Sequence, residues 1–261
     1  MPTQSTLPPE VLKTLQEAEQ GLSPEPAEIA EPSDSHFELA AGYLDLNGRW
    51  VTDFEVRELT GRDEEAISKT SKVGTMMLEI LSRGLVRVGP HKGAAALDGL
   101  LGGDWETVLL AVRIVTFGDD VEYRITCREC RNEFEATVHL SELPRTRLTE
   151  PSDIRFTHTG RHGDEYEVCL PLGATTRKLL QNPDRTPSEQ NSIMLRDCVE
   201  RINGRAALPE QVMNMPLVDR RNILQTIMDN KPGPRLEGVA FLCPNCGVEN
   251  TLNLNIAALF S

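Results

Sequence analysis

The chain has 261 residues and is acidic, with 40 Asp and Glu residues against 27 Lys and Arg residues and a formal net charge of −13. Proteins that bind duplex nucleic acid gain most of their affinity from cations on phosphates, so this balance argues against a nucleic-acid partner. A mean hydropathy of −0.32 and the lack of an apolar run of about 18 to 20 residues argue against a membrane span.

The first segment, residues 1–38, is rich in proline and acidic residues and poor in large apolar ones. Such a composition buries too little surface to offset the entropy of ordering, which predicts a flexible arm. Residues 39–120 are expected to form a hairpin followed by helices. The hairpin signal is Asn47-Gly48 between two apolar runs, because Asn-Gly tolerates the positive φ of a tight turn.

Two long helices are expected after this hairpin, with a short helix over 94–101 between them. Thr60 is predicted to cap the first, with acidic residues at the positive end of the helix dipole, and Gly84 ends it. A short strand over 85–88 follows. Asp104 is predicted as the N-cap of the second helix, which ends at Gly118.

Further along, residues 154–168 have the pattern of another hairpin. Thr186-Pro187-Ser-Glu189 is a capping box with proline at the first helical position. The helix that it starts is expected to include Ile202 and to end at Asn203-Gly204. Another helix is predicted over 217–229.

Two Cys-x-x-Cys pairs, Cys127 with Cys130 and Cys243 with Cys246, are the strongest signal in the chain. Each pair lies between two short runs of alternating apolar residues, which predicts that each forms the tip of a β-hairpin. Four thiolates form closed tetrahedral zinc sites that stabilise a fold. We therefore predict that these four cysteines bind one structural Zn²⁺ per chain. Cysteines in metal spacing also favour a reducing compartment over a disulfide framework.

The predicted zinc ribbon is split. One half is expected over residues 121–140 and the other over 236–256, within a domain that extends over 121–261. A hairpin and helical insertion, 141–235, separates the halves. The fold class expected is α+β, with a mainly helical body and short β-hairpins inserted between the two halves of a four-cysteine zinc ribbon.

The residues outside the two pairs give no catalytic pattern. A catalytic zinc needs an open coordination position, and four thiolates leave none, so neither enzymatic activity nor a small-molecule substrate is expected. His158 and His162 are four residues apart, but glycines around them disfavour a helix, and they are expected in a turn. Cys169 and Cys198 lie on apolar runs and are expected to be buried free thiols.

Two alternatives stay open. A zinc-ribbon protein that binds nucleic acid, or serves as an adaptor, would use the arginines between Arg145 and Arg161. A zinc-dependent hydrolase would need a ligand other than cysteine and an open site.

Several short motifs succeed one another along the chain, and they comprise 57–65 (RELTGRDEE), 80–84 (ILSRG), 100–104 (LLGGD), 110–113 (LAVR), 117–118 (FG), 197–199 (DCV), 219–221 (DRR) and Phe260, together with the two cysteine pairs. In this order they resemble the T4-like bacteriophage baseplate protein family, which supplies hub and assembly proteins of contractile tails. The resemblance spans about residues 40–260. It departs at Trp105, where the family tends to have Arg.

The resemblance implies a non-enzymatic structural or assembly protein of the baseplate of a contractile phage tail or a related injection system. Its partners would be other baseplate, hub or tail proteins, without nucleic acid or membrane. It would be found in the host cytoplasm during assembly, and it would then either leave or stay in the tail of the virion. Candidate contact surfaces are the helix start at 60–65 and the helix at 104–113. Capping and core packing are the alternative roles of both segments.

Overall fold

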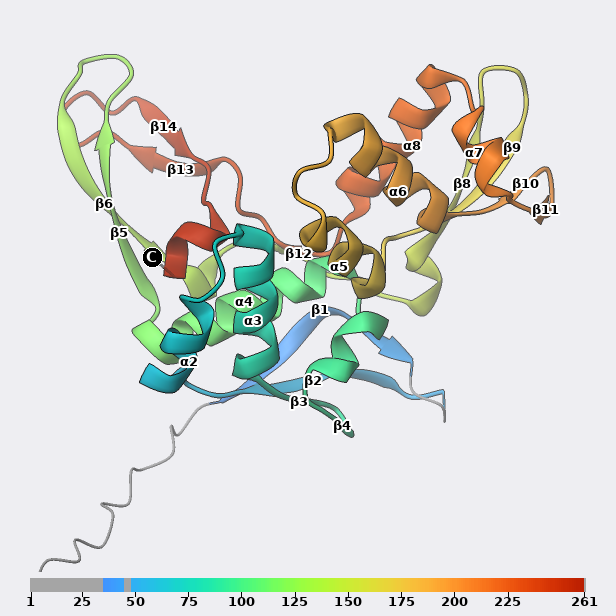
Figure 1. The fold of residues 1–261 in the computed structure, drawn as a ribbon. Helices are drawn as coiled ribbons and strands as arrows, with labels where there is room; N and C mark the ends of the chain where they lie inside the picture. Colours follow the sequence, from blue (N-terminus) through green and yellow to red (C-terminus); the bar gives the residue numbers. More distant parts are fainter. Residues whose placement is uncertain (1–34, 45–47, 261) are drawn as a thin grey trace, which may run out of the picture. The chain divides into compact units, whose positions relative to one another are not determined.

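A computed structural model describes residues 35–44 and 48–260 (Figure 1). Most of the predicted arm over residues 1–38, and Asn47 of the predicted turn, lie outside the described residues. Among the described helices, none combines the length and the apolar character needed to cross a lipid bilayer.

The first sheet has four antiparallel strands, in the order β1 (His36–Leu44), β2 (Trp50–Val56), β3 (Leu85–Val88) and β4 (His91–Lys92). The predicted hairpin and the predicted strand at 85–88 are therefore confirmed. β1 pairs with β2 from Leu44 with Trp50 to His36 with Glu55, and the register shifts between Glu38 and Tyr43. This bulge removes backbone N–H groups of β1 from the β-ladder and leaves them for another acceptor.

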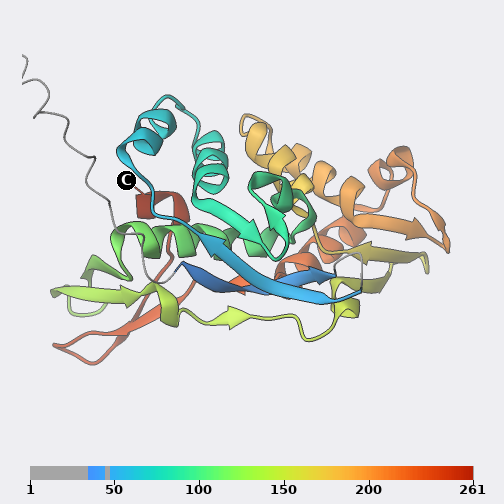
Figure 2. The same cartoon turned by 90° about the horizontal axis from the view of Figure 1, so that it is seen from below.

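Three helices accompany this sheet, namely α2 (Gly61–Ile67), α3 (Val73–Gly84) and α4 (Gly102–Phe117). α3 and α4 lie beside the first sheet in Figures 1 and 2. Their apolar side chains form one core with those of β1, β2 and β3. The largest buried side chains of this core include Leu39, Phe54, Ile80, Leu81 and Trp105. Burial of each such side chain contributes about 1.5–3 kcal/mol.

The helix expected from Thr60 to Gly84 is instead two helices. At the break, the Ser68 hydroxyl donates to Glu65 O and the Thr70 hydroxyl donates to Ile67 O. Hydroxyl groups that bond to nearby carbonyls compete with the helical backbone pattern, and this competition favours the end of α2. The second expected helix begins two residues before Asp104, with Leu101 rather than Asp104 as its N-cap.

The second four-stranded sheet has the order β11 (Arg205–Ala206), β10 (Val199–Ile202), β9 (Glu165–Cys169) and β8 (Arg155–Thr159). It packs with three helices, α6 (Pro187–Cys198), α7 (Pro209–Met213) and α8 (Leu217–Asn230). A further helix, α5 (Gly173–Gln181), lies between α6 and the first core, against which its Leu180 packs. The predicted hairpin at 154–168, the capping box at Thr186 and the helix at 217–229 are confirmed.

The remaining elements are short. β7 (Arg145–Thr146) pairs with β12 (Gly233–Pro234). The described residues also form four 3₁₀ helices, namely η1 (Ala94–Gly99), η2 (Leu140–Glu142), η3 (Pro151–Ile154) and η4 (Ile256–Phe260). The two cysteine-bearing hairpins are β5 (Asp120–Thr126) with β6 (Glu133–His139), and β13 (Val239–Leu242) with β14 (Glu249–Leu252).

The expectation of a mainly helical body is wrong. In the described part of the chain, seven α-helices occur with five small antiparallel sheets, two of which have four strands. One cause is the segment after Cys198, which was expected to continue α6. It forms β10, and Asn203-Gly204, both with positive φ, makes the turn to β11 instead of ending a helix. The domain division at residue 120 remains a prediction.

The start of α4 lies in backbone contact with the segment that precedes β12. A Cβ atom at Gly103 would lie 1.6 Å from Pro232 O, whereas a Cβ atom at Gly99 would meet no atom within 4 Å. Gly103 is therefore required by the close approach of two backbones, and Gly99 is not.

We predict that Gly103→Ala lowers the free energy of unfolding by about 3 kcal/mol or more, because a carbonyl oxygen rather than a flexible side chain must move. Gly99→Ala is the matched control and should change it by less than about 0.5 kcal/mol. Urea denaturation followed by circular dichroism measures both. Equal stability of the two variants would contradict this packing.

Candidate functional site

The two cysteine pairs lie at the tips of hairpins, as predicted. β5 and β6 pair without interruption from Asp120 with His139 to Thr126 with Glu133, and Cys127 follows directly. β13 and β14 pair from Val239 with Leu252 to Leu242 with Glu249, and Cys243 follows in the same way. In Figure 1 the two hairpins extend side by side, although they are far apart in the sequence.

The structure brings the four thiols together. Cys127 Sγ lies 3.6 Å from Cys246 Sγ, and Cys130 Sγ lies 3.7 Å from Cys243 Sγ. All four sulfur atoms lie within 4.8 Å of one another. Disulfide sulfurs are about 2.05 Å apart, so these distances exclude a disulfide. A tetrahedron with metal–sulfur bonds of about 2.3 Å has sulfur–sulfur edges of about 3.8 Å, so the cluster has the dimensions of a four-thiolate site.

The two tips have matching backbone hydrogen bonds. Cys127 N donates to Asn132 O, and Arg131 N donates to Cys127 O. In the second tip, Cys243 N donates to Val248 O and Gly247 N donates to Cys243 O. The tips are therefore two copies of one turn, and each presents its two thiols toward the other pair.

Backbone N–H groups also act on a thiol of the cluster. The backbone N–H group of Cys130 and, to a smaller extent, that of Glu129 donate to the thiol of Cys127. These hydrogen bonds lower the pKa of Cys127 to about 6. A thiol that deprotonates readily is suited to metal binding, because the thiolate is the ligand form.

Asn250 is a residue of this site that the sequence analysis missed. It is buried on β14, its Oδ1 accepts a hydrogen bond from Arg128 N, and its Nδ2 donates to Val248 O. Its Nδ2 also lies 3.7 Å from Cys127 Sγ. The side chain thus joins the second hairpin to the first tip. In the sequence, Asn250 could have been recognised only as a polar residue at a position where the alternation of the strand predicts an inward side chain.

The equivalent residue after the second cysteine has positive φ in both tips, 62° at Arg131 and 72° at Gly247. Glycine adopts this conformation without strain, whereas a residue with a Cβ atom does not.

We predict that Arg131→Gly raises the free energy of unfolding by about 0.5–1 kcal/mol, because it relieves the left-handed backbone strain. Arg128→Gly in the same turn is the control. Its position has no positive φ, so it should give no gain. Thermal denaturation of both metal-loaded variants measures the difference, and a gain in neither or in both would contradict the argument.

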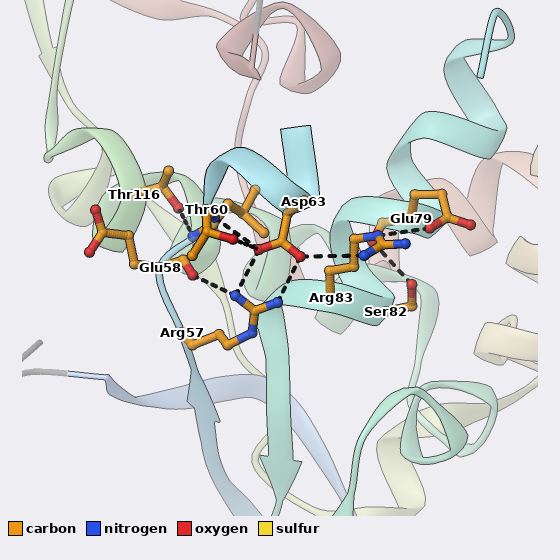
Figure 3. Close-up of polar contacts among 9 residues, drawn as sticks. Arg57, Glu58, Thr60, Asp63, Glu79, Ser82, Arg83 and Thr116 are labelled. Carbon is orange, nitrogen blue, oxygen red and sulfur yellow. Dashed lines mark hydrogen bonds and ion pairs between the residues drawn. The ribbon is translucent and has the colours of Figure 1, made fainter. Parts of the chain in front are cut away.

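A second polar cluster surrounds Asp63 (Figure 3). Arg57, directly after β2, donates to both carboxylate oxygens of Asp63 at 2.8 and 2.9 Å, and Arg83 near the end of α3 lies 3.4 Å from one of them. Thr60, the N-cap of α2 as predicted, donates to Asp63 through its backbone N–H and its hydroxyl. One buried carboxylate therefore holds the ends of β2 and α3 against the start of α2.

Arg57 and then Thr60 hold the pKa of Asp63 well below its ordinary value, although burial acts in the opposite direction. A lowered folded-state pKa stabilises the fold at pH values above the unfolded-state pKa, which is about 3.9. This contribution is lost as the pH falls through the folded-state pKa.

The candidate contact surface at 60–65 is only partly available to a partner. Asp63 is buried within the protein, whereas Gly61, Arg62, Glu64 and Glu65 remain exposed.

The other candidate contact surface, 104–113, is wrong. Most residues of α4 from Asp104 to Val112 are buried against the neighbouring elements, so core packing is the role of this helix. Trp105 Nε1 donates to Leu97 O at 2.7 Å, and the indole thus fills the interior with its polar group satisfied.

Asp104 binds the bulge of β1. Its carboxylate accepts hydrogen bonds from Ala41 N at 2.9 Å and from Gly42 N at 3.0 Å. Burial raises the pKa of Asp104 to about 6, and the hydrogen bonds from the backbone act in the opposite direction. Because the folded-state value lies above the unfolded one, the stabilising contribution of protonation is complete below pH of about 4 and is lost as the pH rises through 6.

We predict that raising the pH from about 4 to 6.5 costs the wild-type protein up to about 3 kcal/mol of unfolding free energy through Asp104 alone. This contribution is absent in Asp104→Asn. The measurement is the difference between the two proteins in urea unfolding at each pH, because titrations that they share then cancel. A difference that does not change with pH would contradict the raised pKa.

The remaining candidates have structural surroundings. Cys198 is buried and Cys169 is partly buried, and both are free thiols, as predicted. His158 lies on β8 and stacks on Tyr166, so the expectation that it lies in a turn is wrong, whereas His162 lies in the turn after β8. In the basic segment 145–161, Arg147 pairs with Glu38 and Arg155 pairs with Glu200, which weakens the case for a phosphate-binding surface.

Residues 47–260 match the model of a protein family described as "T4 bacteriophage base plate protein". Comparisons with curated proteins and with solved structures gave no match. The matched segment includes both cysteine pairs and the Asp63 cluster.

Proposed function

Since the match covers most of its length, the chain belongs to the T4 bacteriophage base plate protein family, and from this we propose that it is a structural or assembly protein of a contractile-tail baseplate. In this proposal it has no enzymatic activity. One zinc ion, bound by Cys127, Cys130, Cys243 and Cys246, stabilises it. Its partners are other baseplate, hub or tail proteins, in the host cytoplasm during assembly and in the finished tail.

The convergence of the four thiols supports the zinc. Soft sulfur donors at the corners of a tetrahedron favour zinc over the hard cations that prefer oxygen. Cys127 and Cys243 are buried and Cys130 is partly buried, so most of the cluster is shielded from solvent. Four thiolates fill the coordination shell of the ion, which supports a structural role of the metal rather than hydrolysis.

The packing around the hairpins supports a structural role of the whole ribbon. Val138 and Leu140 from the first half and Leu254 and Leu259 from the end of the chain share one buried cluster with Leu110 of α4. Arg113 on α4 donates to Leu259 O at 2.7 Å and to Gly118 O at 2.8 Å. The metal site is thus fixed to the body of the protein, and it does not form a separate module.

We predict that the purified chain contains about one zinc ion, measured by atomic emission, and that a strong chelator abolishes its cooperative unfolding, because metal binding and folding are coupled. The double variant Cys127→Ser, Cys243→Ser should show the same loss. Cys169→Ser, which removes a thiol outside the cluster, is the control and should keep both the zinc content and the cooperative unfolding of the wild type. Cobalt substitution checks the ligand set by its thiolate charge-transfer absorption.

Wild-type melting of the double variant would refute the zinc proposal. The role in the tail is tested separately by deleting the gene and examining the particles by electron microscopy. The proposal expects tails without complete baseplates, restored by the wild-type gene. Normal tails after deletion would refute the assembly role whatever the metal content.

A further inference from the structure

Two thiols outside the four-cysteine cluster lie next to each other in the second sheet. Val168 on β9 pairs with Val199 on β10, and the next residues at this end of the two strands are Cys169 and Cys198. Residues opposite each other in an antiparallel pair have Cα atoms about 4.5–5.5 Å apart, a separation that a disulfide spans. Both side chains also belong to one apolar cluster, with Cys198 inside it and Cys169 packed against it.

The two thiols have different surroundings. Cys198 is fully buried, whereas Cys169 is partly exposed. The thiol of Cys198 donates a hydrogen bond to the sulfur of Cys169, and this bond lowers the pKa of Cys169, although burial acts in the opposite direction. The same contact, together with burial, raises the pKa of Cys198. Cys169 is therefore the thiol that deprotonates more readily and that a reagent in solution reaches first.

An ion pair lies beside Cys169. Arg155 on β8 is the register partner of Cys169, and its guanidinium is 2.9 Å from the carboxylate of Glu200. The two charges act on the pKa of Cys169 in opposite directions, since Glu200 raises it and Arg155 lowers it. A partly exposed thiol that accepts a hydrogen bond from a second, buried thiol has the features of cysteines that attack disulfides, because the thiolate is the nucleophile.

We propose that Cys169 and Cys198 form a reversible disulfide by exchange with a small external disulfide, for which glutathione disulfide is the probe. The Cys169 thiolate attacks one sulfur of the probe, so the S–S bond of the probe breaks, a mixed disulfide forms on Cys169, and one thiolate leaves. The Cys198 sulfur then attacks Cys169 Sγ and displaces the second glutathione, which takes up the proton of Cys198. Two protein thiols are oxidised, and one external disulfide is reduced to two thiols.

The first step prepares the second. The hydrogen bond and the negative charge that raise the pKa of Cys198 come from the sulfur of Cys169. Both disappear once that sulfur is part of a mixed disulfide, so Cys198 becomes easier to deprotonate when it has to react. The bond would fix the end of α6, where β10 begins, to the end of β9. This inference is independent of the zinc, because neither thiol belongs to the four-cysteine cluster.

The experiment treats the purified, metal-loaded chain with excess glutathione disulfide, blocks the remaining thiols with iodoacetamide and digests the protein with trypsin without reduction. Trypsin cleaves after Arg and Lys, so Cys169 and Cys198 fall on the separate peptides 162–177 and 197–201, neither of which contains a cysteine of the cluster. Mass spectrometry should detect these two peptides joined, and dithiothreitol should separate them.

Two single variants test the order of the steps. Cys198→Ala removes the second thiol without placing a polar group in the apolar cluster, and it should accumulate protein with one glutathione on Cys169. Cys169→Ser leaves only the buried thiol at this site, and Cys198 should take up glutathione at least about tenfold more slowly than Cys169 does in Cys198→Ala.

The measurement on the wild type does not depend on either variant. Absence of the joined peptides in excess glutathione disulfide would overturn the proposal, and so would equal rates of glutathione uptake at the two positions. Neither result bears on the baseplate role, which the gene deletion tests separately.

Discussion

The convergence of four thiols is the constraint on which the architecture depends. The two pairs are separated by about 110 residues of sequence, and closing a loop of that length costs about 4 to 5 kcal/mol of chain entropy. The apolar cluster beneath the hairpins offsets part of this cost. Binding of structural zinc to zinc-finger peptides releases roughly 10–16 kcal/mol, so one ion on this cluster would outweigh the entropy of closure. The insertion is then fixed at both ends, and its own sheet and helices fold between fixed points.

Buried carboxylates fix the irregular segments of the body in a common way. Asp63, Asp104 and Asp219 all lie in the first turn of a helix, where the dipole favours negative charge. Each is bound to a group outside that turn. Asp63 binds Arg57, Asp104 binds the bulge of β1, and Asp219 accepts a hydrogen bond from Arg161 N in the loop after β8. These positions fall within the short motifs of the sequence, which explains why acidic residues recur there.

Local signals in the sequence were sufficient for elements whose cause is local. The cysteine spacing, the Thr186 capping box and the alternation around each hairpin depend on neighbours in the chain, and they predicted the corresponding structures. The segment after Cys198 failed because a run of four apolar and charged residues fits a helix or a strand equally well. It becomes β10 through pairing with β9, which is a tertiary contact. Asn250 and Asp104 were beyond local reasoning for the same reason, since their partners lie 122 and 63 residues away.

Helix α4 connects the four-thiol cluster to the rest of the protein. Its residues Trp105, Val108 and Val112 belong to the core of the first sheet, whereas Leu110 belongs to the cluster beneath the cysteine hairpins. Ile256 and Phe260 of η4 contact both clusters, and Arg113 holds the carbonyl of Leu259. The strands of the two hairpins therefore pack directly on α4, which in turn packs on β1, and the four-thiol cluster lies at the far end of these packed strands.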